Sequence, residues 1–201
     1  MIEITDDIKD IILELFNTGI GRSAVSLSEL LGEEIILSVP TIEILIKEKD
    51  SLKPFFESKL AGLNEFVAVT QNFSGGLEGE GFLLFPILSG KTLVNTIMNQ
   101  DENGDKSFDV LELEAISEVG NLVLNSVGCA ISDMIEVEIC SELPNVRIIK
   151  DLIELFNEQK EEDWLYIMGE ALFSVKEKNI AGKIAFSFCY QYIEKIIQKF
   201  L

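Results

Sequence analysis

The sequence has 201 residues, of which 47% are hydrophobic and 25% charged, so it has the composition of a globular protein and is long enough to bury a sizeable core. Its 16 Lys and Arg residues against 35 Asp and Glu residues give a formal charge of −19, which repels both a phosphate backbone and an anionic lipid surface. Nucleic acid and membrane insertion are therefore not expected, and a protein partner with a basic face is favoured.

Scarce residue types exclude further kinds of chemistry. The chain contains no histidine, so catalytic triads with an imidazole base are excluded and a zinc site is not expected. Cys129, Cys140 and Cys189 are widely spaced without a CxxC motif, and we expect them to be small core residues in a reducing, cytoplasmic setting. No secretory segment is recognised and no apolar run reaches roughly 18 residues. An enzyme here must use carboxylates, amides or groups that its substrate brings.

The first predicted element is a long amphipathic helix over about 6–31, because apolar residues recur with helical spacing from Ile8 to Phe16. An extended segment, a two-strand hairpin around a glycine-containing turn and a short helix are predicted to follow it, over 33–45, 65–86 and 89–100.

The second half repeats this order after a polar linker over 99–109. The predicted elements are again a long helix, an extended segment, a hairpin and a short helix, over about 109–134, 136–149, 164–188 and 189–201. In each half an insert, 46–64 or 151–163, separates the extended segment from the hairpin and is expected to be mobile or helical.

The two halves are similar in sequence as well as in order. A shift of 104 positions superimposes identical residues along the helix and the extended segment: Glu14 on Glu118, Asn17 on Asn121, Ser28 on Ser132, Glu34 on Glu138, Ile35 on Ile139 and Pro40 on Pro144. Because a half of about 100 residues is small, we expect one domain over 1–201, made of two repeats at about 1–100 and 105–201 with a shared core. The predicted fold class is α+β, with two pseudo-symmetric halves, long helices packed on antiparallel sheet, and six strands in one or two sheets.

A polar frame recurs in both halves. Glutamate followed three residues later by asparagine places both side chains on one face of a helix. In the first half this pair is preceded by an acid four residues earlier and followed by a proline 23 residues after the asparagine. The frame residues are Asp10, Glu14, Asn17 and Pro40 in the first copy and Glu114, Glu118, Asn121 and Pro144 in the second.

A third Glu–Asn pair shows how little the short spacing means by itself. Glu154 and Asn157 have the same spacing, but Lys150 takes the place of the acid and Ile180 that of the proline. A single pair is typical of the polar edge of an amphipathic helix. The long frame, present twice, is the feature that points to function.

This frame resembles that of the CheC family of chemotaxis phosphatases, relatives of CheX and of the flagellar switch protein FliY. The first copy satisfies the frame fully, whereas Glu114 stands where Asp or Ser is usual. The resemblance covers nearly the whole chain, and the second intact pair resembles CheC more than single-site CheX. It implies hydrolysis of the aspartyl phosphate on a CheY-type response regulator in chemotaxis signalling.

The resemblance also implies a role for each residue. Asn17 and Asn121 would orient water in line with phosphorus, as a glutamine does in small GTPases. Glu14 and Glu118 would dock on a lysine of the regulator, with Asp10, Pro40, Glu114 and Pro144 as accessory frame residues. No cofactor is intrinsic, because the regulator would supply its own Mg²⁺. A CheD-type deamidase is a second partner that the resemblance suggests.

Two other functions fit the same sequence. The first is a non-catalytic adaptor that binds the regulator, the CheD-type deamidase or both. The second is a calcium loop, because six oxygen-bearing residues of the linker stand at the ligand positions of an EF-hand: Asp101, Asn103, Asp105, Ser107, Asp109 and Glu112. Lys106 stands where that loop requires glycine, which opposes calcium binding.

Two glycines in the first helix also need a reason, because each weakens a helix by roughly 1 kcal/mol relative to alanine. Gly19 and Gly21 lie just after Asn17, where they would allow either a partner or the neighbouring secondary structure to approach closely. The second copy has Val123 and Asn125 at these positions. We therefore expect the two sites to differ in activity, with no ranking from the sequence.

Overall fold

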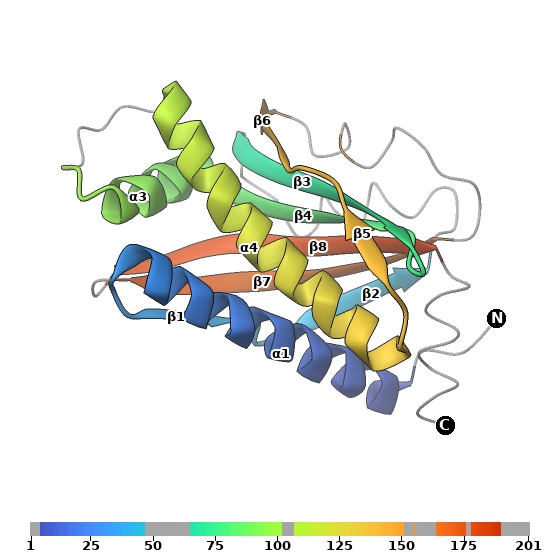
Figure 1. The fold of residues 1–201 in the computed structure, drawn as a ribbon. Helices are drawn as coiled ribbons and strands as arrows, with labels where there is room; N and C mark the ends of the chain where they lie inside the picture. Colours follow the sequence, from blue (N-terminus) through green and yellow to red (C-terminus); the bar gives the residue numbers. More distant parts are fainter. Residues whose placement is uncertain are drawn as a thin grey trace.

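The computed structural model describes residues 5–46, 65–101, 107–150, 155, 164–175 and 178–189. In these residues one antiparallel sheet carries two long helices across one of its faces (Figure 1). The two predicted inserts and the predicted C-terminal helix lie almost entirely outside the described residues.

Both long helices form where the apolar spacing places them. Helix α1 spans Asp6–Leu31 and helix α4 spans Val110–Ile135, and a shorter helix, α3, spans Ile87–Ile97. Helix α1 begins with the Thr5 hydroxyl accepting from the Ile8 N–H and ends at Gly32, whose φ of 65° is the left-handed conformation that glycine adopts most easily.

The predicted hairpins are confirmed, but the sheet formed by the described residues has eight strands and not six. The strands are β1 Ile35–Ser38, β2 Ile42–Ile46, β3 Phe66–Gly75, β4 Gly79–Pro86, β5 Ile139–Ser141, β6 Asn145–Ile149, β7 Trp164–Val175 and β8 Lys178–Cys189. Each predicted extended segment is divided in two near its proline, because proline has no N–H to donate to a strand ladder.

The two halves exchange strands. Strands β1 and β2 of the first half pair with β7 of the second, whereas β5 and β6 of the second half pair with β3 of the first. The central pair, β4 and β8, joins the two hairpins into a single sheet. One main hydrophobic core lies between this sheet and the helices and draws on both halves, with Phe16, Val69 and Phe186 among its members. The α+β class with a shared core is confirmed.

The first of the two helix glycines has a packing role. A Cβ on Gly19 would lie 2.6 Å from the Cα of Val127 and 2.8 Å from the carbonyl oxygen of Ser126, so the absence of a side chain allows α1 to approach the backbone of α4. Gly21 is exposed, and a Cβ there would meet nothing within 4 Å. Close packing of the long helices therefore accounts for Gly19 and leaves Gly21 as open helix surface.

Helix α4 combines length with an apolar composition. Its Val110–Met134 segment is long and apolar enough to cross a membrane, by length and composition only. More than half of its most apolar stretch is buried inside the protein, with Ile116, Val123 and Val127 in the main core. The apolar character of α4 is thus accounted for by its packing in the protein.

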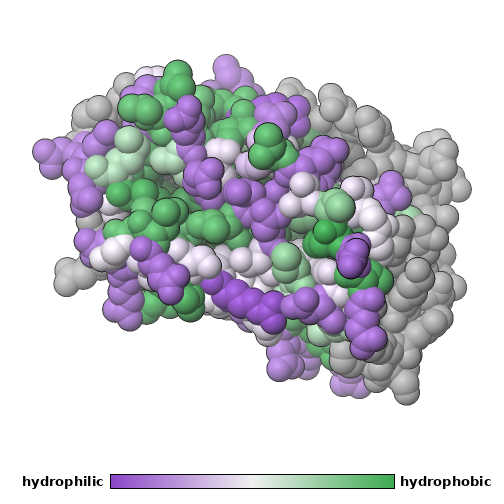
Figure 2. Space-filling view, viewed as in Figure 1, coloured by the Kyte–Doolittle hydropathy of each residue, from purple (hydrophilic) through white to green (hydrophobic). Residues whose placement is uncertain are grey.

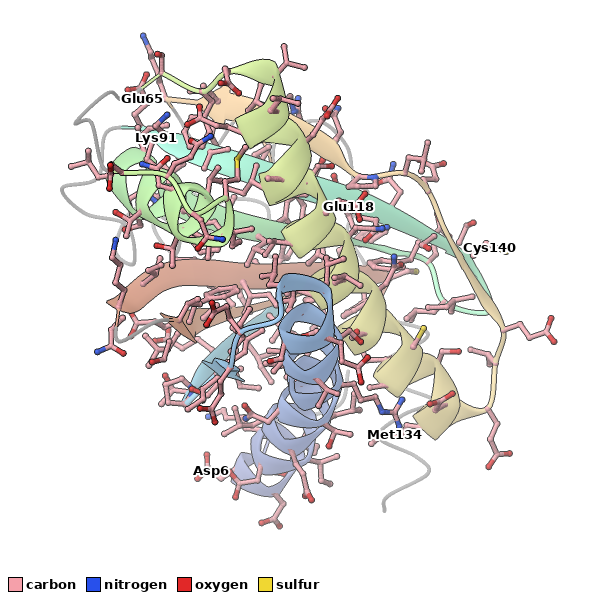
Figure 3. The ribbon with its side chains drawn as sticks, turned by 60° about the vertical axis from the view of Figure 1, so that its left-hand side comes forward. Asp6, Glu65, Lys91, Glu118, Met134 and Cys140 are labelled. Carbon is pink, nitrogen blue, oxygen red and sulfur yellow. The ribbon has the colours of Figure 1, made fainter. Side chains whose placement is uncertain are left out.

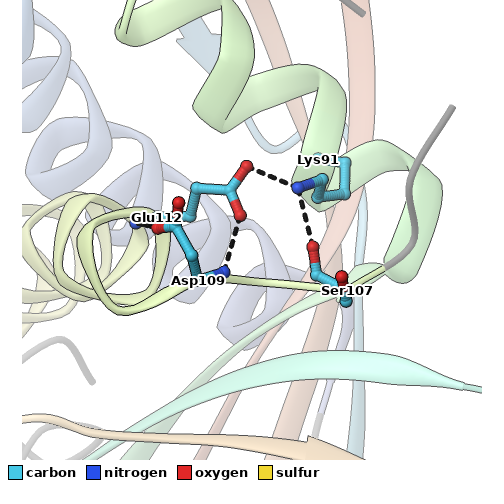
Figure 4. Close-up of polar contacts among 4 residues, drawn as sticks. All are labelled: Lys91, Ser107, Asp109 and Glu112. Atoms are coloured by element: carbon cyan, nitrogen blue, oxygen red, sulfur yellow. Dashed lines mark hydrogen bonds and ion pairs between the residues drawn. The ribbon is translucent and has the colours of Figure 1, made fainter. Parts of the chain in front are cut away.

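A buried ion pair joins α3 to the start of α4 (Figure 4). Lys91 Nζ contacts Glu112 Oε1 and donates to the carbonyl of Ser107 at 2.7 Å, and both charged side chains are only 7% exposed. Glu112 also accepts from the Asp109 N–H at 2.8 Å, which completes a capping box on α4. The described end of the linker, residues 107–109, is therefore bonded to both halves.

The cysteines differ from expectation. Cys129 and Cys140 are exposed and Cys189 is half-buried, so the prediction that they are small core residues is wrong. Cys129 is exposed on α4, and Cys140 lies on β5, an edge strand of the sheet in the described part of the chain.

The two helix glycines form a matched pair for stability measurements. Gly19→Ala is expected to reduce the free energy of unfolding by about 1–3 kcal/mol, because its Cβ must displace backbone of α4. Gly21→Ala is expected to increase it by about 0.5–1 kcal/mol, because alanine loses less entropy in an exposed helix. Urea unfolding of both variants measures the difference, and equal effects would contradict the packing role of Gly19.

The ion pair is expected to matter for stability because it is buried. Lys91→Met leaves the Glu112 carboxylate buried without its countercharge and is expected to cost about 3–5 kcal/mol in urea unfolding. Lys9→Met is the control, because Lys9 pairs with Asp6 at 3.2 Å in a largely exposed position and is expected to change stability by less than about 0.5 kcal/mol. A cost for Lys91→Met no larger than that of the control would show that the pair is dispensable.

Candidate functional site

The two copies of the polar frame form two separate sites, one on each long helix. The acids that precede each asparagine, Asp10 and Glu14 on α1 and Glu114 and Glu118 on α4, are all exposed. Figure 3 shows Glu118 about a third of the way along α4, past the end of that helix where Lys91 lies. Hydrophilic residues cover much of both helices in Figure 2, whereas hydrophobic residues gather toward α3 and the start of α4.

In the first site the asparagine is bonded to the backbone next to the frame proline. Asn17 Nδ2 donates to the Val39 carbonyl at 2.9 Å, and Asn17 Oδ1 accepts from the Val39 N–H at 3.0 Å. Val39 lies between β1 and β2, outside the strand ladder, so its polar groups need partners elsewhere. The long spacing between asparagine and proline thus has a structural cause, because the side-chain amide replaces the missing strand partner.

This arrangement leaves Asn17 with little free bonding capacity. Its second N–H donates to the Leu13 carbonyl at 3.1 Å, so both donors and one acceptor position are used within the protein. Val39 is fully buried beside Gly169 of β7, where a Cβ would lie 2.6 Å from Val39 Cγ1. The bare backbone at Gly169 therefore permits Val39 to lie close to the sheet.

The second site is built differently. Asn121 Oδ1 accepts from Gln71 Nε2 at 3.1 Å and from Asn125 Nδ2 at 2.7 Å. Gln71 Nε2 also donates at 2.9 Å to the carbonyl of Glu142, two residues before the frame proline. Within the described part of the chain, Asn121 Nδ2 has no hydrogen-bond partner. This site therefore holds its amide through the oxygen and leaves the nitrogen as a donor.

The loops beside the two prolines differ accordingly. Leu143 holds the position that corresponds to Val39, yet it is 90% exposed whereas Val39 is 0% exposed. The Glu142 side chain accepts from Asn72 Nδ2 at 2.9 Å, and its N–H donates to the Asn72 carbonyl at 3.0 Å, which fixes this loop to β3. Two copies with the same motif therefore present different chemical groups.

Sequence reasoning identified the asparagines but missed the groups that orient them. Gln71 lies 50 positions before Asn121 and belongs to the other half, so no local spacing connects them. Asn125 was noticed only as the counterpart of Gly21. The signal that could have found Asn125 is its position four residues after Asn121, which places both side chains on the same face of the helix.

The basic residues near the helices serve local contacts. Arg22 on α1 pairs with Asp133 on α4 at 2.8 Å in an exposed position, whereas Lys91 is bonded to Glu112 in the interior. The frame acids are therefore the dominant exposed charges on the two sites. This favours a partner that brings positive charge of its own.

The predicted calcium loop is only partly within the described residues, since 102–106 lie outside them. Both carboxylate oxygens of Glu112 are already bonded, one to Lys91 and one to the Asp109 N–H. The residue that should bind calcium through two oxygens is thus engaged in structure. Among the described residues no group of three or more acids and cysteines is placed to hold a metal ion.

The opposite face of the sheet carries a cavity of about 830 Å³. Thr70, Asn72, Glu80 and Tyr166 are among the residues that line it, and Thr70 and Asn72 alternate along β3 with the helix-facing Val69 and Gln71. Burial raises the pKa of Tyr166 to about 12, and the nearby Glu80 adds to the effect. The cavity is separated by the sheet from the asparagines.

The chain is similar to two curated proteins of Bacillus subtilis. It is 26% identical over 153 residues to the CheY-P phosphatase CheC, which covers 72% of this chain and 68% of the relative. It is 25% identical over 142 residues to the flagellar motor switch phosphatase FliY, which covers 70% of this chain but only 35% of that protein. No family model matches the chain.

Solved structures show the same fold. Thermotoga maritima FliY matches with a TM-score of 0.75 and 22% identity, over 99% of this chain and 98% of that one. A chain of the complex of CheX with CheY, BeF3 and Mg²⁺ from Borrelia burgdorferi matches with a TM-score of 0.51 and 15% identity, over 89% and 97% of the two chains. The resemblance predicted from the motif frame is confirmed: the chain is a homologue of CheC and FliY and shares the fold of FliY.

Proposed function

We propose that this protein hydrolyses the aspartyl phosphate of a CheY-type response regulator. The observation that carries the proposal is the exposed acid and oriented amide on α4, in a chain homologous to a CheY-P phosphatase. A chain of similar fold occurs in a complex with CheY, which supports a CheY-type partner.

The reaction suits a site without a strong base. An acyl phosphate is already activated, so hydrolysis needs mainly an aligned water molecule and stabilisation of developing charge. The water oxygen bonds to phosphorus while the bond from phosphorus to the aspartyl oxygen breaks, which yields a free carboxylate and inorganic phosphate that keeps both protons of the water. Mg²⁺ held by the regulator neutralises charge on the phosphoryl group, and this chain needs no metal of its own.

Asn121 provides the groups that this step requires. Its Nδ2 carries two N–H groups, one to hold the attacking water and one to donate to a phosphoryl oxygen, where charge develops. Its Oδ1 is fixed by Gln71 and Asn125, so the donors are presented in a set orientation. Preorganised donors of this kind stabilise a transition state without reorganisation during the reaction.

Asn17 is less suited to the same role. Both of its N–H groups donate within the protein, which leaves a single acceptor position on Oδ1. The two sites therefore differ in activity, and the second is the stronger one.

Glu14 and Glu118 serve as docking groups for a lysine of the regulator, with Asp10 and Glu114 adding to the acidic face. All four are exposed, and the net charge of −19 steers a basic face toward this protein. Pro40 and Pro144 act indirectly, by ending the strands whose neighbouring backbone orients the amides.

An adaptor function is the second candidate, and the bonding of Asn17 favours it for the first copy. An asparagine that is fully engaged with Val39 serves the fold and leaves Glu14 to bind a partner. In this alternative the protein binds the regulator, a CheD-type deamidase or both, without turnover.

The asparagines separate these functions and rank the sites. Asn121→Ala is expected to lower the rate of dephosphorylation by about 10²-fold, as removal of one oxyanion donor does in other enzymes. Asn17→Ala is expected to have a smaller effect. The measurement is phosphate release from a phosphorylated CheY-type regulator with Mg²⁺, compared among buffer, wild type, both single variants and the double variant. Binding without any acceleration by the wild type would support the adaptor instead.

The docking role of the acids predicts a change in binding. Glu118→Lys is expected to weaken binding of the regulator at least tenfold at low salt, because it places a like charge opposite the docking lysine. The loss should shrink as the salt concentration rises, because screening weakens exposed charge pairs. Glu29→Lys, an exposed acid elsewhere on α1, is the control for net charge. Equal losses of affinity in both variants would show that only the net charge of the protein matters and that Glu118 has no specific docking role.

A further inference from the structure

We propose that Gln71 is the positioning residue of the second site and sets which atoms of Asn121 face the phosphorylated regulator. This inference rests on the proposed function and adds a residue that lies outside the motif frame. Gln71 comes from β3 in the first half, whereas Asn121 lies on α4 in the second. The second site is thus completed by the opposite half of the chain.

The geometry fixes the orientation of the Gln71 amide. Its side chain is 2% exposed, and its Nε2 donates both to Asn121 Oδ1 at 3.1 Å and to the Glu142 carbonyl at 2.9 Å. Two acceptors for the two N–H groups of one nitrogen define the plane of that amide. Gln71 therefore connects helix α4 with the loop that precedes Pro144.

The orientation of Asn121 follows from these bonds. Its oxygen accepts from two nitrogens, Gln71 Nε2 and Asn125 Nδ2, which occupy both lone pairs. Rotation of the amide by half a turn would place the Asn121 nitrogen against two donors and lose both bonds. The N–H groups of Asn121 are therefore held in the outward orientation that the proposed reaction uses.

Gln71 meets this requirement at a cost to stability. Its Oε1 is buried, and among the described residues it has no hydrogen-bond partner. A buried acceptor without a partner is unfavourable, so an apolar side chain of the same length would suit the core better. A residue retained against local stability at a site is a sign of function.

The first site has no such residue. On β7 the register places Ala171 at the position of Gln71, the Val39 side chain packs on the neighbouring Gly169, and the Val39 backbone bonds Asn17 directly. Asn17 is thus bonded by the backbone of Val39, whereas Asn121 is bonded by the side chain of Gln71. This difference converts an asparagine with occupied donors into one with free donors.

The test uses the full chain with Asn17→Ala, so that only the second site operates. Into this parent we would introduce Gln71→Met, which keeps length but removes the donors, and Gln71→Glu. Asn72→Ala is the control, because Asn72 is exposed and contacts Glu142 but not Asn121. The readouts are kcat and KM for dephosphorylation, the melting temperature, and affinity for the regulator with beryllium fluoride and Mg²⁺.

Gln71→Met is expected to lower kcat at least tenfold while KM and affinity change less than about twofold, without lowering the melting temperature. A residue that served only the fold would instead lower the melting temperature. Asn72→Ala is expected to keep kcat within about twofold of the parent.

Gln71→Glu adds a signature in its pH profile. Ionised, the introduced carboxylate accepts but cannot donate, so Asn121 turns its nitrogen inward and kcat falls. Protonated, it donates through O–H to Asn121 Oδ1 as the glutamine does. The kcat of this variant should therefore rise as the pH falls through the pKa of the introduced group, and the parent should lack this rise.

The outcomes separate the two proposals. If the parent is active and Gln71→Met retains its kcat, the Gln71 inference is overturned and the phosphatase function stands. If wild type is active but the Asn17→Ala parent is not, the inference is also overturned, because the second site then does no chemistry. If wild type itself does not accelerate dephosphorylation, both proposals fail.

Discussion

The frame proline imposes the constraint on which both sites depend. Proline ends a strand, and the backbone groups beside it must then find partners outside the ladder. At Pro40 the Asn17 side chain meets this need for the buried Val39, and at Pro144 the Gln71 side chain bonds the carbonyl of the exposed Glu142. The geometry of each asparagine is therefore set by the groups that bond the backbone beside a broken strand, and at the second site one of these groups comes from the opposite half.

Much of the fold could be predicted because its helices and hairpins are local features. Apolar spacing placed α1 and α4 to within a residue at each end, and alternation around glycine turns placed both hairpins. The sequence pattern predicts six strands and not eight because each extended segment is apolar on both sides of its proline, so it looks like one strand although the proline divides it in two. The exchange of strands between halves depends on pairing at long range, which no local pattern encodes.

The sequence predicts which residues make up the candidate site, but not which hydrogen-bonding groups they present. The repeat and the frame identified Glu14, Asn17, Glu118 and Asn121, whose catalytic roles stay predictions. Their hydrogen-bond partners lie on other elements, and identical motif letters gave no sign that one asparagine uses its donors internally while the other does not. The sequence did indicate a difference, through the replacement of Gly19 and Gly21 by Val123 and Asn125, and Asn125 proves to contact Asn121.

The exchange of strands limits how the chain can be divided. A fragment ending near residue 100 would keep β3 but lose β5 and β6, which cover one edge of that strand. A fragment beginning there would leave β7 without β1 and β2. Either piece would expose an apolar strand edge that invites pairing with another copy. The shared sheet therefore needs strands from both halves, whereas the exposed residues of each long helix can differ without affecting it.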